Sequence, residues 1–201
     1  MYRFQIACWI LGIGMSLGVG HATADSPPVP AVDYRARARM PQGIEMSVAH
    51  HQGRLRMEID SANLSNGMVG LIDLEQNGMI VLMDVPGMDR IAVATDLPPG
   101  FSYSDARHQG TRAGTGEALG EACELWRFEA RALNQPVESC ITADGIVLRT
   151  TTVRDGKPLV LFEVLALERA PQDPAQFTLP KGVKVRKLPP GMRGLLPDLV
   201  R

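Results

Sequence analysis

The chain has little charge imbalance, few aromatic residues and few cysteines. Its formal net charge is −1, and binding to nucleic acid needs a basic face that displaces counterions from phosphates. Charge alone therefore argues against nucleic acid as a ligand. The sequence also lacks a Gly-x-Ser-x-Gly nucleophile elbow, a His-Glu-x-x-His zinc motif and a glycine loop that cradles phosphate. These absences argue against an enzyme, and we predict no catalytic residue and no cofactor.

One local group does contain the residue types of a catalytic triad: Ser102, Ser104, Asp105 and His108. Triad members normally come from distant segments of a fold, so we interpret this group as the polar composition of a loop.

A metal site is also not expected. His50 and His51 are adjacent in a predicted strand, so their side chains point to opposite faces and cannot chelate one ion together. One histidine with Met46 or Met57 would suit copper, and a periplasmic copper carrier stays an alternative. Exposed histidines at a strand end are the commoner case, and we adopt that reading.

The first 24 residues have the layout of a cleaved signal peptide. Arg3 gives a positive start, an apolar run extends from Ile6 to Val19, and an Ala-Thr-Ala cleavage site ends at Ala24. A membrane anchor is the alternative, but the run is shorter than the roughly 20 residues that a spanning helix needs. Almost no apolar run precedes Cys8, which argues against a lipoprotein signal. We expect export to the periplasm with cleavage after Ala24.

Export leaves Cys123 and Cys140 in an oxidising compartment, where a pair of thiols normally becomes a disulfide. A loop of this size contributes about 3 kcal/mol to stability in the chain-entropy model. Two buried free thiols are the alternative. A predicted turn at Asn134-Gln135 offsets the two cysteines, so we expect the bridge to need a bulge or an asymmetric loop.

Alternation of apolar and polar residues predicts β-strands from Tyr34 onward, and no stretch has the i, i+3, i+4 spacing of a helix. Asn77-Gly78, Asp144-Gly145 and Asp155-Gly156 are turn signals between consecutive strands. We expect about eleven short strands in an antiparallel meander, with no internal repeat. The predicted fold class is mainly β, as a curved open sheet or a barrel.

Two predicted strands, 79–83 and 159–167, are apolar on both faces and need cover on both sides. A sheet curved around something apolar would provide it. The irregular stretch 96–110 is long for a loop and suggests a short helix or a lid. The Gly-rich stretch 111–119 leads into a strand at 121–130. The predicted parts are a signal peptide (1–24), a Pro-rich lead-in (25–33), a β domain (34–187) and a basic tail (188–201). We expect the residues from 181 onward to be poorly ordered or to dock on another surface.

Seven methionines fall in the first half of the predicted sheet: Met40, Met46, Met57, Met68, Met79, Met83 and Met88. Methionine is flexible and polarizable, which suits a face that adapts to varied ligands. Gap-filling in an ordinary core is the alternative. Trp126 and Phe128 share one face of their strand, opposite Cys123 and Leu125. We interpret this pair as an anchor of the core, and contact with a ligand is the alternative. The candidate cavity-lining residues are Met46, Met57, Met68, Met79, Met83, Trp126, Phe128 and Leu161.

Two stretches carry a family resemblance: Gly116-Glu117-x-x-Gly120-Glu121-x-Cys123-x-x-Trp126, and the run from Cys140 to Arg149. They resemble the middle of small periplasmic proteins with the lipoprotein-carrier (LolA/LolB-like) fold. The run 171–180 resembles the closing motif of uncharacterised members. The resemblance covers roughly residues 34–187. It implies an antiparallel sheet folded as a half-open barrel, whose concave apolar face is closed by short helices or loops and accepts acyl chains in characterised relatives.

The expected function is a non-enzymatic periplasmic protein that shelters a lipid acyl chain or another hydrophobic ligand, in envelope lipid or lipoprotein handling. The alternative is a protein-interaction or regulatory module of the cell envelope with the same fold and no ligand. Rows of arginine at 35, 37, 39, 54 and 56 would meet anionic headgroups in a peripheral membrane contact. We interpret them instead as a solvated face paired with Glu45 and Glu58 across strands.

Overall fold

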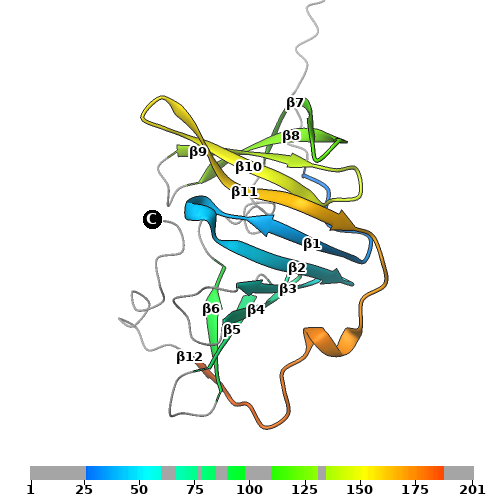
Figure 1. Ribbon diagram of the computed structural model, residues 1–201, viewed down its shortest axis with the longest axis vertical. Coiled ribbons are helices and arrows are strands. Elements are labelled where there is room, and N and C mark those ends of the chain that lie inside the picture. Colours follow the sequence, from blue (N-terminus) through cyan, green and yellow to red (C-terminus); the bar gives the residue numbers. More distant parts are fainter. Residues whose placement is uncertain are drawn as a thin grey trace, which may run out of the picture.

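The computed structural model describes residues 26–59, 67–76, 78–84, 90–97, 110–130 and 135–187. They form one sheet of twelve strands in the order β12-β6-β5-β4-β3-β2-β1-β11-β10-β9-β8-β7 (Figure 1). The predicted signal peptide, the tail 188–201, Met88 and the Ser102–His108 group lie outside the described residues. So does most of the stretch 96–110, where we predicted a short helix or lid.

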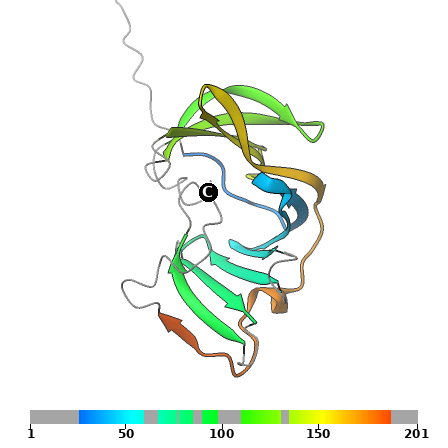
Figure 2. The same cartoon turned by 60° about the vertical axis from the view of Figure 1, so that its left-hand side comes forward.

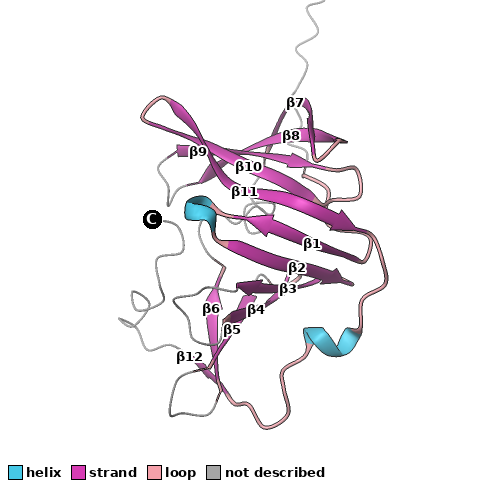
Figure 3. Ribbon diagram, viewed as in Figure 1, coloured by secondary structure: helices cyan, strands magenta, loops and turns pink. Residues whose placement is uncertain are grey.

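The sheet is antiparallel except where β12 runs parallel to β6, and Figure 3 shows how strands dominate the molecule. Two 3-10 helices, η1 (Pro41–Gly43) and η3 (Pro174–Phe177), are the helices within the described ranges. The strands are β1 (Tyr34–Arg39), β2 (Glu45–His51), β3 (Arg54–Ile59), β4 (Met68–Asp73), β5 (Gly78–Met83), β6 (Ile91–Asp96), β7 (Thr111–Ala118), β8 (Glu121–Ala130), β9 (Gln135–Ile141), β10 (Val147–Arg154), β11 (Lys157–Glu168) and β12 (Val185–Lys187).

The mainly antiparallel β prediction is confirmed, and two details of it were wrong. The Gly-rich stretch 111–119 contains the edge strand β7, which pairs with β8 through backbone hydrogen bonds that need no apolar pattern. Residues 185–187, which we expected in a poorly ordered or docking tail, add β12 to the sheet beside β6.

Three hairpins share one turn geometry. β2 joins β3 through Gln52-Gly53, β7 joins β8 through residues 119–120, and β10 joins β11 through residues 155–156. In each turn both central residues have positive φ, for example 45° and 75° at Gln52 and Gly53. Two left-handed residues give the type I′ twist that matches the twist of the flanking strands. Consecutive strands therefore pair antiparallel with little chain between them.

The sheet curves, with β1 and β2 at the bend and β4–β6 and β7–β9 at the two ends (Figure 2). Register shifts interrupt the pairing of β1 with β11, β10 with β11, β9 with β10 and β7 with β8. Such bulges bend a strand and increase its local twist. The sheet is not closed, because β12 and β7 end it on opposite sides.

The strongly apolar strand β5 has cover on both faces, as its pattern predicted. Its Val81 lies in the main core cluster, together with Tyr34 and Met46. On the other face Leu82 packs with Leu71 and Ala92, and residues 179 and 183 from the segment after η3 cover them. The same expectation for β11 was wrong. Val164 is buried there, but Val160 is 40% exposed.

The predicted disulfide between Cys123 and Cys140 is present, with Cα atoms 5.4 Å apart. Cys140 pairs in register with Leu125, so the two cysteines lie diagonally across β8 and β9. The β8–β9 register runs without a shift. The bridge therefore forms without the bulge that we gave as one possibility, and the loop that we gave as the other, residues 131–134, lies outside the described residues.

The segment 26–33 runs along the inner side of the curve (Figure 2) and is held by the turn between β9 and β10. Ala31 donates its backbone N–H to the carbonyl of Asp144 at 3.0 Å. Gly145 has a φ of +84°, and a Cβ built on it would lie 2.0 Å from the carbonyl oxygen of Val29. Only glycine leaves room for the segment at this point.

We predict that Gly145→Ala destabilises the fold by more than about 2 kcal/mol, because a left-handed alanine costs about 1–2 kcal/mol and the new methyl displaces backbone. Thermal unfolding of the purified variant measures this. Gly156→Ala is the matched control, since Gly156 has a φ of +73° and nothing within 4 Å of a built Cβ. Equal losses in the two variants would show that the contact with Val29 contributes nothing.

Candidate functional site

The five candidate methionines lie on a single face of the sheet. Met46 pairs with Ile59, Ile59 with Met68, and Met68 with Met83, so these residues form one row across β2–β5. Met57 pairs with Gly70, and Met79 with Ile72, in the neighbouring rows on the same face. We call this the inner face, because it is the side along which residues 26–33 run.

These methionines differ in burial. Met46 and Met68 are buried, with 2% and 7% of their surface exposed. Met57, Met79 and Met83 are only partly buried, and they pack against the main core. Gly70 lies between two of them, because a Cβ built there would lie 3.6 Å from the sulfur of Met79 and 3.9 Å from Met57. Two flexible side chains therefore lie next to a position that has no side chain.

Trp126, Phe128 and Leu161 lie apart from the methionines. Trp126 and Phe128 are each 2% exposed and form a second cluster with Val137, against which Leu161 packs. The core-anchor interpretation fits this burial. The Trp126 Nε1–H is buried without a hydrogen-bond acceptor among the described residues. Trp126 is also among the residues that line a cavity of about 400 Å³ beside Pro28.

His50 lies near the end of β2 on the inner face. It is not the exposed residue that we predicted, since only 1% of its surface is accessible. The segment before β1 covers it. Its Nδ1 lies 2.8 Å from the carbonyl oxygen of Val32, and the N–H of Gly53 donates to Nε2 at 3.0 Å. The ring also stacks on Tyr34, with centroids 5.5 Å apart.

These contacts fix the chemistry of His50. A carbonyl only accepts, so Nδ1 carries the proton and Nε2, which accepts from Gly53, carries none. The imidazole is therefore neutral, and neither nitrogen is available for copper. Burial lowers the pKa of His50, outweighing Val32 and Asp33, which raise it. Among the described residues no group of three or more His, Cys, Asp or Glu side chains is arranged to hold a metal ion.

His51 lies on the opposite face, as predicted. Its Nδ1 is 2.8 Å from Asp33 Oδ2, and its ring lies 5.7 Å from that of Phe177 in η3. Burial raises the pKa of Asp33, but hydrogen bonds from His51 and from the Gln172 backbone outweigh it and lower the pKa overall.

Arg169, directly after β11, links the start of β8 to the turn between β9 and β10. It hydrogen-bonds to both oxygens of Glu121 and to Asp144 Oδ2 at 2.7 Å. These bonds hold the pKa of both carboxyl groups below its usual value. The cluster fastens the turn that holds residues 26–33 and is a structural ion-pair network.

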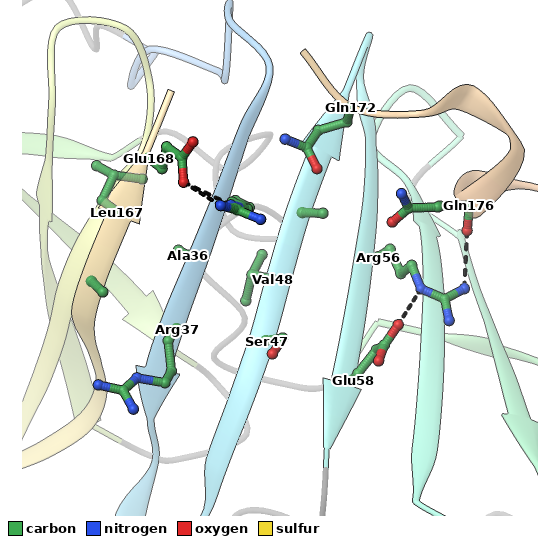
Figure 4. A pocket seen from close by; sticks show the side chains of 13 residues that line it. Ala36, Arg37, Ser47, Val48, Arg56, Glu58, Leu167, Glu168, Gln172 and Gln176 are labelled. Carbon is green, nitrogen blue, oxygen red and sulfur yellow. Dashed lines mark hydrogen bonds and ion pairs between the residues drawn. The ribbon is translucent and has the colours of Figure 1, made fainter. Parts of the chain in front are cut away.

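A groove of about 540 Å³ lies on the outer face, over β11, β1, β2 and β3 (Figure 4). Arg35, Arg37 and Arg56 line it, and the ion pairs of the arginine rows differ from the predicted pairing with Glu45 and Glu58 across strands. Arg35 pairs with Glu168 of β11, and Arg56 pairs with Glu58 on its own strand. Arg39, beside the groove, pairs with Glu163 of β11. The sequence did not reveal Glu163 and Glu168, because nothing local indicates that β11 lies beside β1.

Within the described residues, no helix combines the length and apolar character that crossing a membrane requires.

No family model and no curated protein sequence matches this chain. Solved structures do match. One is PNGF-II, with a TM-score of 0.53 and 14% identity over 79% of this chain. This chain spans 31% of the length of that one. Another is an uncharacterized conserved protein from Thermus thermophilus, with a TM-score of 0.55, 15% identity, and coverage of 78% of this chain and 91% of that one. At such identities the likeness shows the mainly β fold alone, and the lipoprotein-carrier resemblance stays a prediction.

The buried, neutral His50 predicts a loss of stability on mild acidification. An unfolded histidine has a pKa near 6.5, and the folded pKa is lower. As pH falls below about 6.5 the unfolded state takes up a proton that the folded state resists, so stability declines by up to about 1.4 kcal/mol per pH unit. Urea unfolding at pH 7.5 and at pH 5.5 measures this change in the free energy of unfolding. Both pH values lie above the range in which the acidic groups titrate.

His50→Gln is the control for this measurement. It removes the titrating group, so the variant loses stability at both pH values but declines less than the native protein between them. The same decline in both proteins would contradict the assignment to His50.

Proposed function

We propose that this chain is a non-enzymatic binding protein of the periplasm, exported with cleavage after Ala24, whose inner face shelters a lipid acyl chain or another hydrophobic ligand. One observation carries the proposal. Five methionines share the inner face of a curved, open sheet, and three of them are only partly buried. Methionine also fills gaps in an ordinary core, and the partial burial of Met57, Met79 and Met83 is what favours a ligand-facing surface over that alternative.

The energetics suit an apolar ligand. Burial contributes about 0.8 kcal/mol per methylene, so a chain of about ten methylenes would gain roughly 8 kcal/mol before the cost of ordering it. Methionine side chains change rotamer readily and make polarizable contacts, so they fit chains of different length and shape. Binding of this kind needs few polar contacts, which agrees with the apolar composition of the methionine rows.

The finer architecture in this proposal is a half-open barrel whose inner face is closed by short helices or loops. The lipoprotein-carrier resemblance supports it, and so does the course of residues 26–33 along the inner side of the curve (Figure 2). The partner would be a lipid or an acylated molecule of the cell envelope, delivered or received in peripheral contact with a membrane.

We expect Met57→Asp and Met83→Asp to weaken binding of a fluorescent fatty-acid analogue at least tenfold, because each places a charge on the apolar surface. Fluorescence titration of the purified mature protein gives the affinities. The matched control is Val153→Asp on β10, where the native side chain is already 54% exposed. It should bind as the native protein does.

A charge on the inner face also risks unfolding the sheet, so the same titration includes Met57→Gln and Met83→Gln, which keep the side-chain length without a charge. Circular dichroism establishes that each variant is folded. Native affinity in all four folded variants would show that the inner face is not the binding surface.

A further inference from the structure

The middle arginine of β1 lacks the acidic neighbour that the other two have. On β11, Arg35 faces Glu168 and Arg39 faces Glu163, while Arg37 faces Ala166. The register shift between Arg37 and Ala38 produces this arrangement, because it skips one residue of β11 between the two acidic positions. On the other side, Arg37 faces Ser47 of β2.

The ion pairs follow the register. Arg35 Nε lies 2.8 Å from Glu168 Oε2, and Arg39 Nη2 lies 2.9 Å from Glu163 Oε2. Arg37 is exposed and forms no ion pair with any described residue. Figure 4 shows it at the edge of the outer groove, apart from the two ion pairs drawn there.

One wall of the groove is the segment that leads into η3, and it is fastened to the sheet. The N–H of Gln172 donates to Asp33 Oδ2 at 3.1 Å, and Arg56 Nη1 donates to the carbonyl of Gln176 at 3.0 Å. Phe177, the last residue of η3, is buried, with its ring 5.7 Å from that of His51. The side chains of Gln172 and Gln176 line the groove from this wall (Figure 4).

The floor between the walls is low, because its outward-facing residues are small: Ser47, Ala49 and Ala166. The charged residues of the lining are three arginines and two glutamates. Both glutamates already belong to ion pairs, with Arg35 and Arg56. The groove therefore has one net positive charge, located on Arg37.

We propose that this outer groove binds an acidic peptide segment of a partner protein, with a side-chain carboxylate on Arg37. A guanidinium presents paired N–H donors that match the two oxygens of a carboxylate. Gln172 Nε2 already donates one N–H to the carbonyl of Ala170 at 2.8 Å, so its second N–H and its carbonyl oxygen can meet a peptide group, as can the amide of Gln176. The lining holds no aromatic side chain for stacking a base or a sugar. The site is on the face opposite the methionines and is independent of the function proposed above.

The test uses the mature protein and an acetylated, amidated peptide, Gly-Asp-Gly-Asp-Gly, with its Asn counterpart as the uncharged probe. NMR titration at low salt follows the backbone amides of β1 and β2. The acidic peptide shifts them and the Asn peptide does not. Arg37→Gln weakens binding about tenfold or more, as expected for a lost charge-assisted bond. Arg54→Gln, which removes an exposed charge from β3 outside the groove, leaves the affinity unchanged.

Ala166→Glu is the second variant. Position 166 is exposed, and a glutamate there supplies Arg37 with the partner that Arg35 and Arg39 already have. The fold is kept and peptide binding is lost. Equal binding of the two peptides, or native affinity in Arg37→Gln, would overturn the proposal. Glutarate that binds as tightly as the peptide would also overturn the proposal, because a free carboxylate would then be enough. Binding of phosphatidylglycerol vesicles through Arg37, without binding of the peptide, would overturn it too.

Discussion

The pairing of β1 with β11 is the contact on which the rest of the structure depends. Residues near the start of the described chain meet residues more than a hundred positions later, and this pairing makes β2–β6 and β7–β10 parts of one sheet. Ion pairs at Arg35 and Arg39 flank it on the outer face, and Ala36 and Ala38 are buried on the inner face. Both proposed sites follow from it, because it sets the bend behind the methionine rows and leaves Arg37 without an acid.

Much of the fold could be predicted because its signals are local. Period-two alternation located most of the strands, and Asp155-Gly156 marked a turn that the structure has. The two cysteines could be paired from the predicted compartment alone. The partner of each edge strand could not be predicted. β7 has exposed, small residues, and β12 joins the sheet through a three-residue parallel pairing whose sequence is basic.

The candidate site shows the same division between local and long-range information. Alternation within each strand was enough to place Met46 and Met57 on one face, because neighbouring hairpins keep their register. The burial of His50 could not be read from its own strand, since the cover comes from residues before β1. The outer groove could not be predicted from the sequence for a related reason. Of its two acids, Glu58 lies on β3 and Glu168 on β11, and its amides come from residues 172 and 176, so only the folded chain assembles the groove around Arg37.

The central claim is that the inner face holds an apolar molecule. Native mass spectrometry of the mature protein, purified from a periplasm without detergent, tests it most directly when organic extraction follows. We expect a population heavier than the disulfide-bonded polypeptide, and release of a lipid or an acylated molecule into the organic phase. A single mass equal to that of the polypeptide, with nothing extracted, would contradict the claim.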